Sequence, residues 1–116
     1  MVKAPSEGDI IELDVDEEAA GHEQRGRRPA LVVSVTAFHE SGLAIVCPVT
    51  THAGRAARSR SSLEVPIRSG HKVARVILSH QVKTVDWKAR RSAVLDTVPR
   101  PTLLAVRARL KAFLGL

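Results

Sequence analysis

The chain has 116 residues, 44% hydrophobic and 26% charged, which fits a single soluble domain able to bury a core. It has no run of about 18 apolar residues and no apolar segment near its start, so neither a membrane-spanning helix nor a signal peptide is expected. Its net charge is +6, and eight of its twelve acidic residues lie within the first 23 positions. The strongly basic remainder favours a polyanionic partner, either a nucleic acid or an acidic protein segment; the alternative is a basic protein with no such partner.

The single cysteine, Cys47, excludes an internal disulfide, gives no indication of a metal cluster and suits a reducing cytoplasm. Aromatic residues are sparse, since the chain has one tryptophan, two phenylalanines and no tyrosine. Stacking of bases on a row of aromatic rings is therefore not expected as the main mode of nucleic-acid binding. Phosphate contacts from arginine and lysine would have to contribute more.

The first predicted elements are a strand, a long loop and a second strand. Ile11, Leu13 and Val15 alternate with acidic residues, and this period of two predicts a half-buried strand with an acidic outer face. Residues 16–28 are small and polar and are expected to form a loop, and loops of this length are usually functional or mobile. Residues 29–35 form an apolar run, which predicts a strand buried on both faces.

Four later segments carry the pattern of strands, and turn residues or a basic loop separate them. The predicted strands are 43–51, 63–67, 73–86 and 92–98. The turns and loops around them are 39–42, 52–62, 69–72 and 87–91. Pro48 lies near the end of the first of these strands, which suggests an edge or a bulge there.

The C-terminal residues follow a helical pattern. Pro101 suits the first turn of a helix, where its missing N–H costs little. Apolar residues spaced by three and four then predict a helix over 100–115: Leu103, Val106, Leu110 and Phe113. We therefore expect one mainly β domain over 1–116, with a flexible segment at 1–7 and five or six strands in a barrel-like sheet capped by the helix.

The polar loop at 21–29 concentrates reactive side chains. The chain has no Walker, dinucleotide-binding, CxxC or HExxH motif, and its histidines lack metal-ligand spacing, so we expect no metal and no cofactor. RNA cleavage by the substrate's own 2′-hydroxyl needs only a base, a donor for the leaving oxygen and positive charge at the phosphate. His22 and Glu23 are candidate bases, while Arg28 is a candidate phosphate clamp. Thr50 is a candidate hydrogen-bond donor to the same phosphate.

Each candidate also has a structural interpretation. Glu23 is alternatively an ion-pair partner of a neighbouring arginine, and Thr50 a turn residue. His80 shares strand parity with Leu78 and Val82, which favours a core-facing, hydrogen-bonded histidine over a catalytic one. The basic loop at 52–62 is either a solvated connector or a phosphate-binding loop.

Four segments occur in a specific order: Gly-Asp-Ile at 8–10, the polar loop at 21–29, Pro-Val-Thr at 48–50 and Gln-Val-Lys-Thr-Val-Asp at 81–86. In this order, and with the core Glu-Gln-x-Gly-x-Arg-Pro before an apolar strand, the sequence resembles the MazF/PemK/Kid family of toxins. These toxins belong to bacterial and plasmid type II toxin–antitoxin modules. The resemblance runs over nearly the whole chain.

The resemblance implies a small SH3-like β-barrel with a C-terminal helix, assembled as a homodimer. It implies metal-independent, sequence-specific cleavage of single-stranded RNA through a 2′,3′-cyclic phosphate. It also implies inhibition by a MazE-like antitoxin with an acidic, disordered tail, which fits the basic net charge. A gyrase-binding toxin of the CcdB type, with the same general fold and no RNA cleavage, is the alternative, and a plain SH3-like binding module is a third.

By motif position, the resemblance makes Arg28 and Thr50 the main catalytic pair. Glu23 and Gln24 match a conserved loop pair, and His22 matches a histidine of the PemK/Kid branch. Because arginine rarely gives up its proton, Arg28 is expected to act as an electrostatic clamp, and His22 or Glu23 as the base. The chain departs from the family at His80, where members commonly carry aspartate, so His80 is a secondary candidate for proton transfer.

Other polar residues of these segments are expected to bind RNA. Arg25 and Arg27 are assigned to phosphate attraction or antitoxin contact, and the basic loop is expected to set sequence specificity. The full set is Gln24, Arg25, Arg27, Arg55, Arg58, Arg60, Gln81 and Lys83.

Overall fold

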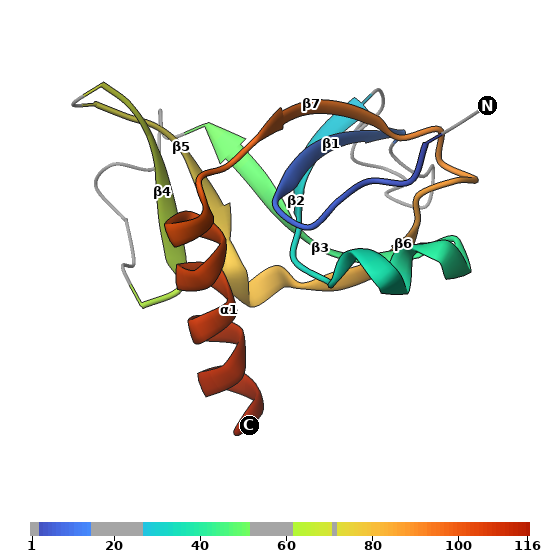
Figure 1. Ribbon diagram of the computed structural model, residues 1–116. Coiled ribbons are helices and arrows are strands. Elements are labelled where there is room, and N and C mark those ends of the chain that lie inside the picture. Colours follow the sequence, from blue (N-terminus) through green and yellow to red (C-terminus); the bar gives the residue numbers. More distant parts are fainter. Residues whose placement is uncertain (1–2, 15–26, 52–61, 71) are drawn as a thin grey trace, which may run out of the picture.

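The computed structural model describes residues 3–14, 27–51, 62–70 and 72–116 (Figure 1). Within these ranges the chain forms strands and short 3-10 helices and ends in one α-helix. The strands are β1 (Asp9–Asp14), β2 (Arg27–Val32), β3 (Leu43–Thr51), β4 (Glu64–Ser69), β5 (Lys72–Leu78), β6 (Lys83–Asp86) and β7 (Ala93–Thr97). The helices are η1 (Thr36–Ser41), η3 (Ser79–Gln81) and α1 (Arg100–Leu114), and none is long and apolar enough to span a membrane.

All strand pairs are antiparallel, and the order across the sheet is β4-β5-β3-β2-β1-β7. The nine-residue strand β3 has β2 on one side, while β6 and β5 follow one another along its other side. An ion pair of 3.7 Å between Arg75 and Asp96 links β5 to β7, which are not neighbours in that order. The sheet therefore curls into a half-barrel, and α1 stands beside β4 and β5 (Figure 1).

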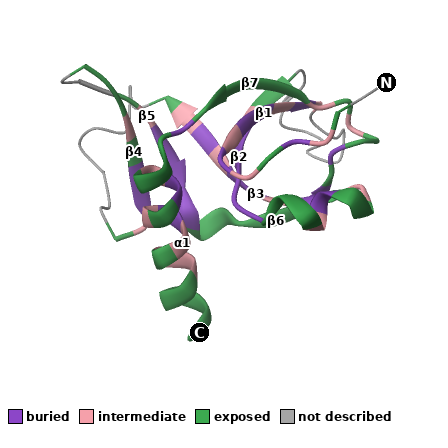
Figure 2. Ribbon diagram, in the orientation of Figure 1, coloured by how far each residue is buried: buried purple, intermediate pink, exposed green. Residues whose placement is uncertain are grey.

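Apolar side chains alternate between the two faces of the curled sheet and form two buried clusters. Figure 2 shows the buried stretches along the strands and α1. The helix face is the cluster of Ile10, Leu31, Val33, Cys47, Val49, Val65 and Ile77, packed with Val98, Leu103 and Val106. The Trp87 face is the cluster of Ile11, Leu13, Ala30, Val32, Ala44, Val46, Val85 and Trp87. The predicted strand buried on both faces is confirmed over 30–32, where successive residues enter opposite clusters, and Val33 just after the strand joins the helix face.

The mainly β fold with a C-terminal helix is confirmed, and α1 follows the predicted stripe at Leu103, Val106 and the partly buried Leu110, whereas Phe113 is 44% exposed. Leu103 and Val106 are 2% and 0% exposed and pack on the helix face. Burial of such a side chain contributes roughly 1.5–3 kcal/mol relative to exposure. Gly115, with φ of 72°, ends the helix in the left-handed conformation that glycine adopts at low cost.

Three predicted boundaries are wrong. The strand predicted over 29–35 ends at Val32, Val35 is 56% exposed, and η1 begins at Thr36. The loop predicted to reach residue 28 ends earlier, because Arg27 and Arg28 pair with Asp14 and Leu13 and already belong to β2. The single strand predicted over 73–86 is broken by η3 into β5 and β6. The break has a topological cause, since β5 pairs with the second half of β3 and β6 with its first half.

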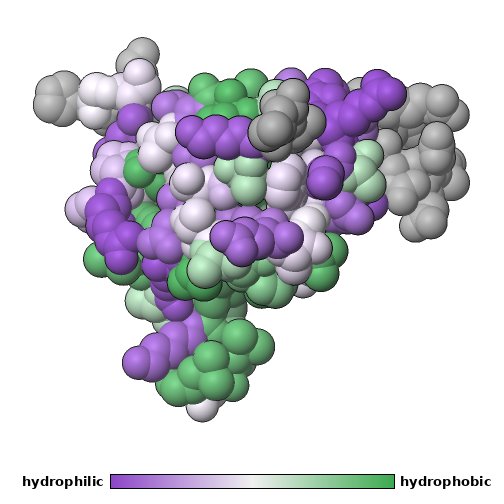
Figure 3. Space-filling view, turned by 45° about the vertical axis from the view of Figure 1, so that its right-hand side comes forward, coloured by the Kyte–Doolittle hydropathy of each residue, from purple (hydrophilic) through white to green (hydrophobic). Residues whose placement is uncertain are grey.

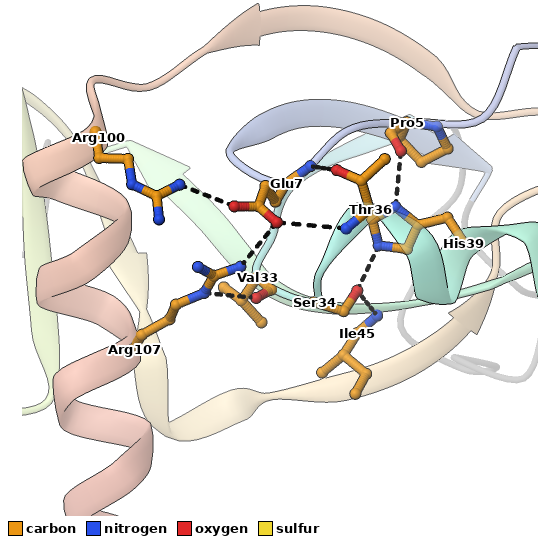
Figure 4. Close-up of polar contacts among 9 residues, drawn as sticks. All are labelled: Pro5, Glu7, Val33, Ser34, Thr36, His39, Ile45, Arg100 and Arg107. Atoms are coloured by element: carbon orange, nitrogen blue, oxygen red, sulfur yellow. Dashed lines mark hydrogen bonds and ion pairs between the residues drawn. The ribbon is translucent and has the colours of Figure 1, made fainter.

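A buried histidine ties the N-terminal segment to the sheet (Figure 4). Ser34 Oγ accepts a hydrogen bond of 3.0 Å from the Ile45 N–H, so its own proton is directed at His39 Nε2, 2.6 Å away. His39 Nδ1 then carries the ring proton and donates it to the Pro5 carbonyl at 2.7 Å. Residues 3–7, part of the segment 1–7 that we expected to be flexible, therefore make specific contacts with the sheet.

A second polar cluster joins the same segment to α1 (Figure 4). The Glu7 carboxylate accepts a hydrogen bond of 2.8 Å from Arg100, lies 3.6 Å from Arg107 and accepts a longer bond from the Thr36 N–H. Arg107 Nε also donates to the Val33 carbonyl at 3.0 Å. Arg100, with smaller contributions from Thr36 and Arg107, holds the pKa of Glu7 below its usual value of 4.5.

Replacing Ser34 with alanine tests the buried histidine cluster. Ser34→Ala leaves the Ile45 N–H and His39 Nε2 without this partner in a buried environment, so we expect it to lower the free energy of unfolding by about 1–3 kcal/mol. Urea denaturation measures the loss. The matched control is Ser69→Ala at the exposed end of β4, which should change stability by less than about 0.5 kcal/mol. An equal effect of both substitutions would contradict this account.

The lowered pKa of Glu7 predicts a dependence of stability on pH. Because the folded state favours the carboxylate, Glu7 contributes stability above pH 4.5, and this contribution is lost as the pH falls through its lower folded pKa. Glu7→Gln should therefore destabilise the protein at neutral pH, and the difference from the parent should shrink in acid. Urea unfolding at several pH values measures this. A difference that grows in acid would have the wrong sign.

Candidate active site

Arg28 is the second residue of β2 and is exposed. It lies across from Leu13 of β1, and its strand parity is that of Ala30 and Val32, so it belongs to the Trp87 face of the sheet. It makes no hydrogen bond or ion pair with other residues in the described ranges. The five N–H donors of its guanidinium are therefore available to an anion.

Thr50 lies near the end of β3 and is half-buried. Its parity is that of Ala44 and Val46, so it also belongs to the Trp87 face. The β2–β3 ladder ends at the pair Ala30–Pro48, so Arg28 and Thr50 each lie two residues beyond its last pair, at the same end of these two strands. The fold thus brings to one face and to neighbouring strands the two residues that the sequence nominated as the main pair.

A guanidinium without a partner among the described residues, on the same sheet face as a hydroxyl, is suited to a phosphodiester. Arginine can donate two parallel hydrogen bonds to phosphate oxygens while contributing a permanent positive charge. A threonine hydroxyl can donate one further bond to an oxygen on which negative charge develops. Lys83, which is exposed and pairs with Val46 of β3, adds positive charge to the same face.

Arg27 differs from Arg28 in its hydrogen-bond partners and in the strand face on which it lies, and the sequence alone could not show either difference. Its guanidinium donates to Glu12 and Asp14 side chains and to two backbone carbonyls, at distances from 2.7 to 3.0 Å. Its parity puts it on the opposite side of β2 from Arg28. Phosphate binding by Arg27, as expected from the sequence, would require it to exchange these bonds.

The expectation of a core-facing His80 is wrong. Because η3 interrupts the strand at this position, parity with Leu78 no longer applies, and His80 is exposed. Its Nε2 lies 3.4 Å from the side-chain nitrogen of Gln81, which is exposed too. Both side chains are therefore accessible to a ligand in solution.

Seven of the expected site residues lie outside the described residues, so their geometry is not part of this site. They are His22, Glu23, Gln24, Arg25, Arg55, Arg58 and Arg60.

Glu64 and Cys47 are buried residues with ionisable side chains that lie outside the expected site. Glu64 and the apolar Val65 are consecutive in β4 and lie on opposite faces of the strand. This alternation predicts that Glu64 is exposed, yet it is only 3% exposed. Cys47 is fully buried on the helix face, and burial raises the pKa of its thiol to about 12. Cys47 therefore remains a protonated core residue at neutral pH rather than a nucleophile.

Comparisons with known proteins identify the family of the chain. A family profile described as "PemK-like, MazF-like toxin of type II toxin-antitoxin system" matches residues 6–114. The endoribonuclease toxin ChpB of Escherichia coli K12 is 37% identical over 106 residues, covering 87% of this chain and 90% of ChpB. The endoribonuclease toxin MazF of the same strain is 31% identical over 112 residues, covering 96% and 95% of the two chains.

The fold comparison gives the same result. A chain from the MazE–MazF crystal structure (Form-II) of Deinococcus radiodurans superposes with a TM-score of 0.83 at 35% identity, over 99% of each chain. Sequence and fold thus agree over nearly the full length. The chain belongs to the PemK-like, MazF-like family of toxins of type II toxin–antitoxin systems.

Proposed function

We propose that this protein is the toxin of a bacterial type II toxin–antitoxin module and that it cleaves single-stranded messenger RNA at specific sequences without a metal ion. The observation that carries the proposal is that Arg28, which has no hydrogen bond or ion pair with the described residues, lies on the same sheet face as Thr50, in neighbouring strands of the MazF-like fold. The relatives named as endoribonucleases support the same reaction class.

The proposed reaction uses the substrate's own nucleophile. The 2′-hydroxyl oxygen attacks the adjacent phosphorus, a base takes its proton, and the bond from phosphorus to the 5′-oxygen breaks to leave a 2′,3′-cyclic phosphate. The leaving 5′-oxygen takes up a proton. Because the attacking group is supplied by the RNA, no metal-bound water is required for this step.

The residues divide this work by their chemistry. Arg28 stabilises the extra negative charge on the phosphate oxygens, and Thr50 donates a hydrogen bond to the same group. His22 and Glu23 are the proposed bases because their pKa values lie closer to neutrality than that of arginine. His80, which is exposed in η3, is the secondary candidate for proton transfer.

The proposed partners follow from charge and exposed apolar surface. The net charge of +6 suits both RNA and the acidic tail of a MazE-like antitoxin, and the superposed D. radiodurans chain comes from a MazE–MazF complex. Apolar side chains gather at the projecting end of α1, seen at the lower tip of Figure 3. These are Phe113, Leu114 and Leu116, which are 44%, 64% and 80% exposed. We propose that they are covered in a homodimer, and that the protein acts in the cytoplasm, where its RNA substrate is found.

Substitution of the proposed pair tests the reaction. Arg28→Ala should lower kcat for cleavage of a mixed-sequence RNA in EDTA by about 10²–10³-fold, the typical effect of removing a charge-stabilising donor, and Thr50→Ala by at least about tenfold. The matched control is Arg68→Ala, which removes an exposed arginine of β4 that makes no hydrogen bond or ion pair with the described part of the chain, and it should leave kcat unchanged.

The activity of the parent protein tests the ribonuclease function, and the activities of the two variants test the site assignment. A parent protein that cuts no RNA in EDTA would contradict the ribonuclease function and favour a toxin that acts by binding protein. Parent activity retained in both variants would contradict the site assignment. Sequencing the ends of the cleaved RNA gives the recognised sequence.

Replacing an apolar residue at the tip of α1 tests the dimer. Leu114→Asp places a charge in the proposed interface, so sedimentation at micromolar concentration should show a dimer for the parent and a shift to monomer for the variant. Val35→Asp, at an exposed apolar residue beside η1, is the control and should remain dimeric. A parent that sediments only as a monomer would contradict the proposal.

A further inference from the structure

Two adjacent arginines begin β2, and among the described residues only Arg27 has hydrogen-bond partners for its guanidinium. We propose that Arg27 is a positioning residue that fixes the start of β2 so that Arg28 faces the substrate. This inference rests on the proposed ribonuclease function, and it gives Arg27 a role other than binding RNA.

The guanidinium of Arg27 is held by four hydrogen bonds. Nε donates to Glu12 Oε1 at 3.0 Å, and Nη1 donates to Asp14 Oδ1 at 2.7 Å. Nη2 donates to the backbone carbonyls of Glu12 at 2.8 Å and Arg91 at 2.7 Å. Every nitrogen of the group is engaged, whereas Arg28 has no such partner within the described ranges.

The bonds of Arg27 select the register of the strand. Arg27 and Asp14 form the terminal pair of the β1–β2 ladder, and a slip of one residue would exchange the faces of Arg27 and Arg28. The two side chains are identical, so their own chemistry does not decide which faces the substrate. The carboxylates of Glu12 and Asp14 decide it, because they lie on one face of β1, while Ile11 and Leu13 lie on the other.

The fourth hydrogen bond of Arg27 connects it to a third segment, the turn before β7. Arg91 has a φ of 53°, which is unusual for a residue with a side chain, and its carbonyl accepts from Arg27. The preceding residue is also joined to β1, since the Asp14 N–H donates to the Arg90 carbonyl and Arg90 Nη1 donates to the Asp14 carbonyl. Arg27 thus ties β1, β2 and the turn before β7 at the point where the site begins.

Local charge argues against phosphate binding at Arg27. The positive charge of Arg27 is already compensated by the Glu12 and Asp14 carboxylates, so a phosphate bound there would have to displace one of them. On the other face of β2, Arg28 has no carboxylate partner in the described part of the chain. Positioning and substrate binding are therefore separated onto opposite sides of one strand.

Cleavage kinetics of the full-length protein test the proposal. Arg27→Ala should lower kcat by about tenfold or more, because small misplacement of a catalytic group is costly, while KM changes little. The slope of log(kcat/KM) against log[salt] should equal that of the parent, since no phosphate contact is lost. The double variant Glu12→Gln, Asp14→Asn should also lose kcat, although it makes the protein more positive. Combining it with Arg27→Ala should add little further loss.

The matched control is Arg107→Ala, which removes another arginine bound to a carboxylate and a backbone carbonyl, on α1. It should lower thermal stability while leaving kcat, measured well below the melting temperature, unchanged. An equal loss of kcat in Arg107→Ala would attribute the effect to general destabilisation and overturn the proposal. So would an Arg27→Ala variant with parent kcat, raised KM and a salt slope reduced by about one.

A second measurement needs no RNA and separates this inference from the function on which it rests. Hydrogen exchange at the backbone amides of 12–14 and 27–28 should be faster in Arg27→Ala than in the parent and unchanged in Arg107→Ala. Unchanged exchange in Arg27→Ala would overturn the positioning role even if the parent cuts RNA. A parent that cuts no RNA would instead contradict the ribonuclease function, while faster exchange would still support the register role.

Discussion

The pairing of β2 between β1 and β3 is the constraint on which the rest of the structure depends. Because β2 is apolar on both faces, each face needs its own cover, and the chain supplies α1 on one side and the Trp87 cluster on the other. The polar start of β2 lies beyond this core, at the end of the β1–β2 ladder. A strand that is rigid in its middle and polar at its end can hold Arg28 in a defined position while leaving it exposed.

An arginine is bound to backbone near each end of β2. Arg107 bonds to the Val33 carbonyl just after the strand, and Arg27 bonds to β1 and the Arg91 carbonyl at its start. Each arginine also pairs with carboxylates, so the carbonyl groups near the strand ends are satisfied by cations whose own charge is compensated. Only the start of β2 carries the proposed site, so the contacts of Arg27 orient Arg28, whereas Arg107 joins the other end of the strand to α1.

The structure explains part of the uneven charge distribution of the sequence. The acidic residues of β1 are not spread over the surface as simple counter-charge, because Glu12 and Asp14 are bound to Arg27. Arg28 and Lys83 remain exposed on the other face of the sheet. A basic protein can thus hold carboxylates close to its site without neutralising the group proposed to bind phosphate, which suits it to RNA and to an acidic antitoxin tail.

The periodicity of apolar residues in the sequence determined the features that arise within a single strand or helix. The alternation in β1, the doubly buried β2 and the stripe of α1 were predictable, and the order of motifs nominated Arg28 and Thr50. Partner strands decided the rest. The break in 73–86 arises because β5 and β6 pair with different halves of β3, and it exposes His80. The different roles of Arg27 and Arg28 arise because carboxylates lie on only one face of β1, and no property of two identical neighbouring side chains could show this.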